Sequence, residues 1–293
     1  MDTEDIVQEL RRPELAREAA LACADKPCPT CSGAAAAAEP SYVYALGRIE
    51  SRFPNLSVEK EFAQAGGRAE AAGLSSQEVV HAVLTKRENR YLVRELGWVL
   101  RVQGLETYLL QPRDPLDFDL LIEAIRPRAS PLDVDAVIGL RGPVAPPDFC
   151  NGLTIPIVRF DQIYSFDTNF LIKAIPRPET MTDERFETMA EEVFFRIMQI
   201  SDNAGATDEH RALNYLAMRC PSIYTSAAEL AGRDFSLAGV EARTPSLGSI
   251  HKVVDVVFSY SNRKTDFQEK YSVRVQMGKY PSLVTKLAPY FDR

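Results

Sequence analysis

Two cysteines, Cys28 and Cys31, form the motif Cys-Pro-Thr-Cys. A two-residue gap lets both thiolates bind one tetrahedral zinc ion. Cys23 and Cys150 are the candidates to complete such a site, and Cys150 lies in the loop-like segment PDFCNG. The alternative is an incidental CxxC in a tail, because strong zinc motifs show two ligand pairs and only one is visible here. Structural zinc is the one cofactor that this pattern suggests. Redox chemistry is disfavoured because the motif opens no strand-to-helix unit of the thioredoxin type.

A second group of residues that could do chemistry lies at the predicted start of a helix and comprises Asp208, Glu209, His210, Arg211 and Asn214. Histidine transfers protons near neutral pH, and a neighbouring carboxylate can orient its ring. The same residues have a simpler explanation, because carboxylates in the first turn of a helix complement its dipole. The favoured interpretation is therefore that no catalytic site is present. An acid–base pair of His210 with Asp208 or Glu209 is the alternative.

Composition, charge and missing motifs exclude several classes of protein. The 293 residues contain 34 Lys and Arg against 41 Asp and Glu, a formal net charge of −7. Such a chain lacks the positive charge with which nucleic-acid-binding proteins displace counterions. No P-loop, Rossmann or GxSxG motif is present, so we expect no nucleotide cofactor. No apolar stretch is long enough to cross a bilayer, and the acidic beginning MDTEDIVQEL is unlike a secretory signal, so we expect a cytoplasmic protein without membrane contact.

Two predicted β-hairpins offer a way to bind an extended peptide. Residues 98–102 and 105–111 flank a two-residue turn, and residues 252–260 and 267–277 flank a longer one. An exposed strand edge can pair with the backbone of a peptide, while side-chain pockets supply selectivity. The alternative is that the aromatic side chains of these hairpins fill the core. The candidate peptide-binding residues are Trp98, Arg101, Tyr108, Tyr260, Tyr271 and Arg274.

The elements that must position these residues mix strands with helices. A buried strand is predicted over residues 42–46, followed by a helix that Ser57 caps. Asp114 and Pro115 have the residue types of the N-cap and first position of another helix. Further elements are a helix over residues 76–86, strands over residues 134–140 and 153–160, and a helix that Asp167 caps.

Beyond the first half, three helices are predicted to begin at Thr182, Thr207 and Pro221 and to pack on one another. The expected fold class is α+β, with a mixed sheet and hairpins, flanking helices, a three-helix middle segment and a C-terminal β-hairpin. Residues 1–40 are predicted to be a helical tail and a tether, because residues 25–40 read DKPCPTCSGAAAAAEP. Residues 41–178 and 179–293 are expected to form two halves packed on each other.

Five segments carry a resemblance to a known family: SYVYALGRIESRFPNLSVEKEFAQ, PRDPLDFDLLIEAIRP, APPDFCNGLTIPIVRFDQIYSFD, DNAGATDEHRALNY and LVTKLAPYFDR. Together they resemble the C-terminal domain of the cyanobactin maturases PatA and PatG, over residues 42–293. In those maturases a subtilisin-like protease usually precedes the domain, and these 293 residues contain none of it. The resemblance therefore implies no protease activity.

The resemblance implies a place in the biosynthesis of ribosomally synthesised, post-translationally modified peptides, as for the stand-alone proteins of the crocagin pathway. The implied partners are a precursor peptide and the other enzymes of the same pathway, with a homo- or heterodimer as a further expectation. Because the domain has no settled catalytic role, we expect an accessory protein that presents the precursor peptide to modifying enzymes. The alternatives are an enzyme that catalyses cyclisation or epimerisation with His210 and a carboxylate, and a purely structural role.

Overall fold

The computed structural model describes residues 40–67, 76–127, 130–179, 181–245, 252–265 and 267–290. The chain divides into two compact units, Met1–Pro40 and Ser41–Arg293. The helices and strands given below all belong to the second unit. The predicted N-terminal tail, with Cys23, Cys28 and Cys31, lies outside the described residues.

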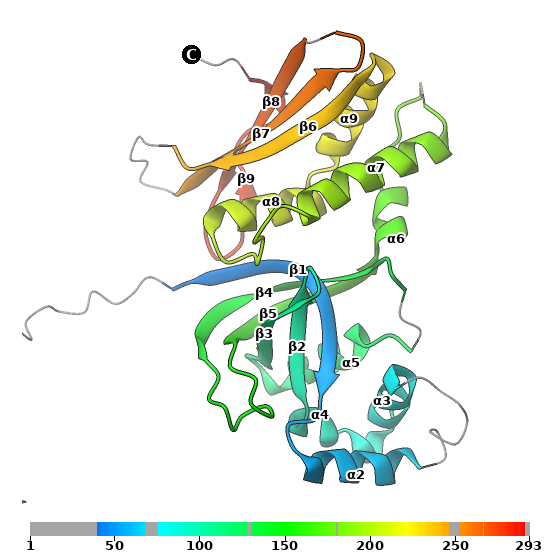
Figure 1. Ribbon diagram of the computed structural model, residues 1–293, viewed down its shortest axis with the longest axis vertical. Helices are drawn as coiled ribbons and strands as arrows, with labels where there is room; N and C mark the ends of the chain where they lie inside the picture. Colours follow the sequence, from blue (N-terminus) through cyan, green and yellow to red (C-terminus); the bar gives the residue numbers. More distant parts are fainter. Residues whose placement is uncertain are drawn as a thin grey trace, which may run out of the picture. The chain divides into compact units, whose positions relative to one another are not determined.

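Five strands close into a barrel (Figure 1): β1 (Tyr42–Arg52), β2 (Gly97–Val102), β3 (Leu105–Pro112), β4 (Asp133–Val144) and β5 (Pro156–Asp167). Their order around the barrel is β1-β2-β3-β5-β4, and neighbours are antiparallel except β3 and β5, which run parallel. This is the arrangement of an OB-fold barrel. Such folds carry many unrelated functions, so the barrel by itself assigns none.

The barrel closes because β1 has two partners. Residues 42–47 pair with β4, and residues 48–52 pair with β2. Gly47 lies at the exchange, where a Cβ would be 2.3 Å from the carbonyl oxygen of Arg101. Only glycine allows two backbones to approach so closely. Apolar side chains from all five strands then form one core cluster with side chains of the adjacent helices.

Short helices connect the barrel strands: α2 (Leu56–Gly66), α3 (Ser76–Leu84), η2 (Arg87–Asn89) and α4 (Leu92–Glu95) before β2, and η3 (Pro115–Asp117) and α5 (Phe118–Ala124) before β4. The predicted cap of the first helix was wrong. Asn55, with extended backbone, accepts a hydrogen bond from the amide of Val58 at 3.0 Å, so the helix begins two residues earlier than a Ser57 cap requires. The predicted start at Asp114 and Pro115 is confirmed, because the Asp114 carboxylate accepts from the amide of Leu116.

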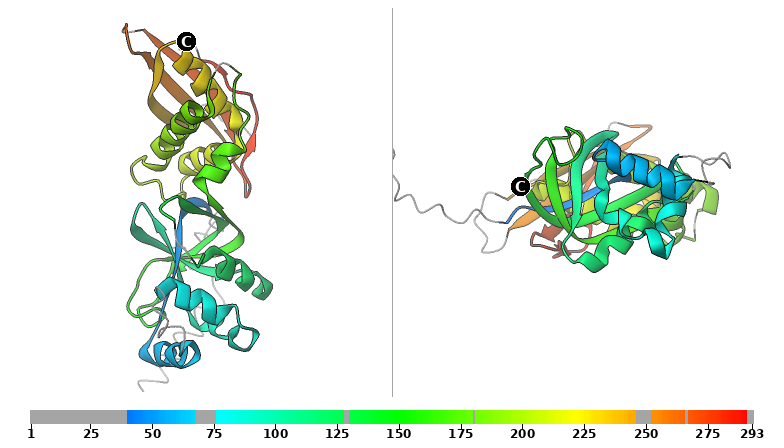
Figure 2. Two further views of the ribbon diagram at one scale, coloured as in Figure 1. Left: turned by 90° about the vertical axis from the view of Figure 1, so that its right-hand side faces the viewer. Right: turned by 90° about the horizontal axis from the view of Figure 1, so that it is seen from below.

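A helical layer and a second sheet follow the barrel. The helices are α6 (Thr168–Lys173), α7 (Asp183–Met198), α8 (Asp208–Arg219) and α9 (Pro221–Gly232), and the last three confirm the predicted middle segment. The antiparallel sheet has the order β10-β8-β7-β6, with β9 also paired to β8: β6 (Phe235–Arg243), β7 (Val253–Asn262), β8 (Gln268–Gln276), β9 (Ser282–Leu283) and β10 (Ala288–Pro289). Helices and sheet share one core, so α7, α8 and α9 cover one face of the sheet (Figure 2).

Helix α8 is joined to the barrel through buried polar groups. The side-chain amide of Asn214, which is 1% exposed, donates to the Tyr44 carbonyl oxygen of β1 at 2.8 Å and accepts from Asn203 at 2.8 Å. The Tyr44 amide donates to the Gly205 carbonyl oxygen at 2.9 Å. Because an unpaired buried amide costs free energy, this network fixes where α8 begins and how it contacts β1.

The observed fold is α+β, as predicted. Both hairpins are confirmed, as β2–β3 and β7–β8. Barrel closure and strand β6 were not predicted. Within the described ranges, no helix is both long and apolar enough to cross a membrane.

Candidate functional site

The first hairpin places its candidate residues in the barrel wall. Trp98 is 2% exposed, and its indole Nε1 donates to the Val93 carbonyl oxygen at 2.9 Å. Tyr108 is 2% exposed and donates to the Ala204 carbonyl oxygen; burial raises the pKa of its hydroxyl. Arg101 forms an ion pair with Glu50 at 3.0 Å. Strand β2 has a partner strand on each side, and β3 pairs with β5 over residues 109–112, so the edge that this hairpin leaves to an added strand is confined to residues 105–108.

The second hairpin uses its candidate residues mainly for packing. Tyr260 is 1% exposed, and its ring lies edge-on to that of Tyr271 with centroids 6.0 Å apart. The hydroxyl of Tyr271 donates to Glu269 at 2.9 Å. Arg274 makes a bidentate ion pair with Asp255 across the β7–β8 pair, at 2.6 and 2.8 Å. The structure therefore accounts for these side chains within the protein itself, and their role in peptide binding stays a prediction.

The polar side chains at the start of α8 contact different partners. Asp208 pairs with Arg211 at 2.8 Å, and Glu209 accepts from the Thr244 hydroxyl at 2.5 Å, which lowers the pKa of the Glu209 carboxyl. Thr207 caps the helix by accepting from the His210 amide. Desolvation lowers the pKa of the half-buried His210 ring. Each carboxylate thus has a hydrogen-bond partner other than the imidazole, which is the arrangement of a capped helix start rather than of an oriented acid–base pair.

Cys150 is the one predicted zinc ligand that the structure describes. It is 2% exposed, and its Sγ lies so close to Gly97 that a Cβ there would be 2.4 Å away. Burial raises the pKa of its thiol, whereas zinc binds the thiolate. In the part of the chain that the structure describes, no group of three or more His, Cys, Asp or Glu could hold a metal ion. The zinc site stays a prediction, because Cys23, Cys28 and Cys31 lie outside that part.

A cavity of about 580 Å³ lies at the end of β1, beside Cys150 and the start of β3. Its lining includes three glutamates, but two of them are already paired: Glu106 with Arg52, and Glu50 with Arg101. These internal pairs neutralise two of the three carboxylates that a ligand would meet. The cavity therefore gives little indication of what it would bind.

Strand β6 has an open edge. In the described part of the chain it pairs with β7 and with no other strand. Every barrel strand has two partners, and β8 has β7 on one side and the short β9 and β10 on the other. An unpartnered edge presents a row of backbone N–H and C=O groups to which another strand can add. The nine residues of β6 are thus the longest such row among the described strands.

A β-bulge shapes this edge. The register with β7 shifts between Leu237 and Gly239, which leaves Ala238 without a partner in β7. Phe235 and Leu237 face the core before the bulge, and Val240 packs against the same core after it. The extra residue therefore shifts the alternation by one position and leaves Ala238 exposed at the surface.

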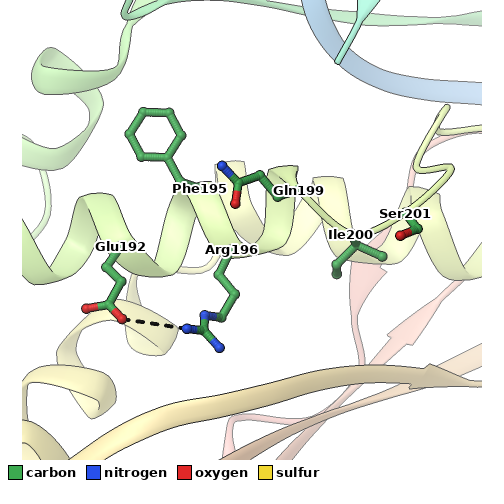
Figure 3. A pocket seen from close by; sticks show the side chains of 6 residues that line it. All are labelled: Glu192, Phe195, Arg196, Gln199, Ile200 and Ser201. Carbon is green, nitrogen blue, oxygen red and sulfur yellow. Dashed lines mark ion pairs between the residues drawn. The ribbon is translucent and has the colours of Figure 1, made fainter.

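The side chain of Arg196 extends from α7 to the bulge. Its Nη1 donates to the Ala238 carbonyl oxygen at 3.3 Å, and its Nη2 lies 3.8 Å from Glu192 one turn earlier. Figure 3 shows Glu192 and Arg196 extending to the same side of α7. Both line a cavity of about 500 Å³ together with Phe195, Gln199, Ile200 and Ser201. The open β6 edge and this cavity therefore meet at one guanidinium group, and they form the candidate site.

A family model described as the PatG domain matches residues 42–242, which include the barrel, α6 to α9 and most of β6. The chain belongs to the PatG-domain family. Among solved structures, a chain described as "PatG Domain of Unknown Function" is similar, with 17% sequence identity and a TM-score of 0.68, over 85% of this chain and 98% of that chain. No curated protein matches the chain. At 17% identity the structural likeness shows that the fold is shared, and the words that describe the other chain assign no activity to it.

Sequence reasoning missed the candidate site of this PatG-domain protein because β6 was not predicted. The segment FSLAGVEAR does alternate, with Phe235 and Leu237 before the glycine and Val240 after it. An alternation that is interrupted at a glycine indicates a strand with a bulge. Arg196 gave no such signal, because an arginine in the last turn of a helix is ordinary.

Proposed function

We propose that this PatG-domain protein is an accessory protein that binds a precursor peptide in the biosynthesis of a ribosomally synthesised, post-translationally modified peptide. The observation that carries the proposal is the open edge of β6 beside a cavity. The resemblance to the cyanobactin maturases supplies the pathway and the class of peptide. The other partners are then the modifying enzymes of that pathway, to which the peptide is presented in the cytoplasm.

The binding mode is strand addition. An extended peptide that pairs with β6 gains main-chain hydrogen bonds whatever its sequence, and alternate side chains reach the surfaces beside the strand. One such surface is the part of the α7 cavity where Glu192 and Arg196 extend to the same side of the helix, because Arg196 contacts the β6 bulge from there (Figure 3). A mode that depends mainly on the backbone suits a protein that must hold a peptide while enzymes act on its side chains.

Presentation rather than catalysis fits the residues around His210. The Glu209 carboxylate accepts a hydrogen bond from Thr244, and the Asp208 carboxylate pairs with Arg211. Asn214 is buried against β1. The acid–base alternative keeps a direct test, because replacement of His210 must then abolish a chemical change in the peptide.

The proposal is tested by calorimetric titration with the short precursor peptide encoded beside the gene, followed by mass spectrometry and chiral analysis of the recovered peptide. Saturable binding without a change of mass or chirality is expected. Ala238→Pro should weaken binding, because a proline at the edge obstructs an added strand, whereas Ala238→Ser is the matched control and should bind as the wild type does. Circular dichroism checks that both variants fold. No heat of binding at high micromolar peptide contradicts the proposal, and turnover by this protein alone replaces it with an enzymatic role.

A further inference from the structure

We infer that Arg196 is a specificity determinant, which binds a carboxylate of the peptide that adds to β6. The inference rests on the proposed function and goes beyond it by naming a chemical feature of the ligand. The contact would form at the β6 bulge, where the added strand either continues or ends.

The present contacts of Arg196 leave its guanidinium available. The ion pair with Glu192 spans 3.8 Å between exposed side chains, with 44% of the arginine and 55% of the glutamate accessible, and the contact to the Ala238 carbonyl oxygen is 3.3 Å long. Charge-assisted hydrogen bonds between guanidinium and carboxylate are typically shorter, at about 2.7–2.9 Å, and are often bidentate. An incoming carboxylate can therefore make a stronger contact than either of the present partners.

The bulge explains why a carboxylate, rather than another backbone amide, belongs at this point. A strand added to β6 pairs through the N–H and C=O groups of the open edge. At Ala238 the outward carbonyl oxygen already accepts from Arg196, and the shifted register interrupts the ladder. The added strand loses a hydrogen-bond partner there, and the nearest free donors are those of the guanidinium. An acceptor with two oxygens at this position of the peptide satisfies them.

Two parts of a peptide can supply the carboxylate. A C-terminal carboxylate at Ala238 belongs to a peptide that ends at the bulge, either antiparallel to β6 beside residues 240–243 or parallel to it beside residues 235–237. The side chain of an Asp or Glu allows the peptide to continue past the bulge. Both sources share the same chemistry, and amidation of the C-terminus or substitution of the acidic residues distinguishes them.

The experiment measures dissociation constants for the precursor peptide in three forms: unmodified, C-terminally amidated, and with its Asp and Glu residues changed to Asn and Gln. Each form is titrated into the wild type, Arg196→Gln, Glu192→Gln and Arg90→Gln. Arg90 is the matched control, because it is a half-exposed arginine in the helical segment before β2 and pairs with the exposed Asp119 at 2.9 Å. Circular dichroism and thermal unfolding confirm that each variant is folded.

Removal of the contacted carboxylate should weaken binding to the wild type by about 3- to 10-fold, the size of a half-exposed charge-assisted contact. Arg196→Gln should bind the unmodified peptide more weakly than the wild type does, by a similar factor. This variant should bind the peptide with the contacted carboxylate and the peptide without it equally. Glu192→Gln should bind the unmodified peptide more tightly, because the substitution removes the carboxylate that competes for Arg196. Arg90→Gln should leave the affinity unchanged.

Equal affinity of the wild type for all three peptide forms overturns the inference while leaving strand addition intact. The inference also fails if Arg196→Gln keeps the full preference for the carboxylate. If no form of the peptide binds to the wild type, the proposed function fails together with the inference.

Discussion

Replacing Asp135 with asparagine should remove the loss of unfolding free energy that ionisation of this buried carboxyl causes at neutral pH. Asp135 lies in β4, is 6% exposed, and accepts hydrogen bonds from the Ile49 amide at 2.7 Å and from the Ser165 hydroxyl at 2.5 Å. Burial raises the pKa of its carboxyl from 3.8 to about 6, although both hydrogen bonds and the charge of Arg126 act in the opposite direction. The site lies beside Gly47, where β1 exchanges β4 for β2. The carboxylate therefore lies at the seam of the barrel.

The sign and size of the effect follow from proton linkage. Because the folded protein holds this proton more tightly than the unfolded chain does, its contribution to stability is complete below pH 3.8 and is lost as the pH rises to about 6. A shift of about two pKa units corresponds to roughly 3 kcal/mol, at about 1.4 kcal/mol per unit. Asparagine keeps an acceptor for Ile49 and offers an amide that can donate to the Ser165 oxygen, but it does not ionise.

The assay is urea unfolding of the wild type and Asp135→Asn between pH 4 and pH 8. Relative to the variant, the wild type should lose roughly 2 kcal/mol of unfolding free energy between pH 4 and pH 7, because part of the shift lies below pH 4. Ser165→Ala should extend this loss to higher pH, because it removes a hydrogen bond that lowers the pKa of Asp135. A difference between wild type and Asp135→Asn that stays constant over this range refutes the reasoning, since it means that Asp135 does not titrate differently in the two states.

Three further substitutions test the start of α8. Asn214→Ala should destabilise the protein by about 2–4 kcal/mol in urea unfolding, because it leaves the buried Tyr44 carbonyl and Asn203 amide with one partner fewer. Gly205→Ala should cost more than about 2 kcal/mol, since φ is +67° and a Cβ would lie 2.2 Å from the Tyr44 carbonyl oxygen; an unchanged melting temperature contradicts that contact. His210→Ala should leave peptide affinity and the mass of the recovered peptide unchanged, whereas loss of a product specific to the wild type supports the acid–base alternative.

Local signals predicted the elements well where the deciding interaction is local. Asp114 and Pro115 were identified as a helix start because one side chain satisfies an amide two residues away. The two hairpins were found because their strands alternate around short turns. Ser57 was predicted as the cap from its residue type alone, whereas the extended backbone of Asn55 makes Asn55 the cap in the structure.

Closure of the barrel could not be predicted in this way, because it depends on contacts distant in the sequence. Gly47 meets the backbone of Arg101, and β3 pairs in parallel with β5 more than forty residues later along the chain. Closure also determines where the side chains of Trp98 and Tyr108 lie. On an isolated hairpin they could face a ligand, but in a closed barrel with β1 and β5 as neighbours they fill the interior. Strand β6 carries a local signal in its alternation, but whether its edge is open depends on which strands pair with it, and that is again set by contacts distant in the sequence.

The most direct test of strand addition is hydrogen exchange of the backbone amides, measured by mass spectrometry with and without saturating precursor peptide. Strand addition predicts slower exchange in peptides that cover residues 235–243, because outward amides of β6 gain hydrogen bonds, and little change in the closed barrel. Peptide binding with unchanged exchange in residues 235–243, or protection confined to the barrel, contradicts the assignment of β6 as the binding edge.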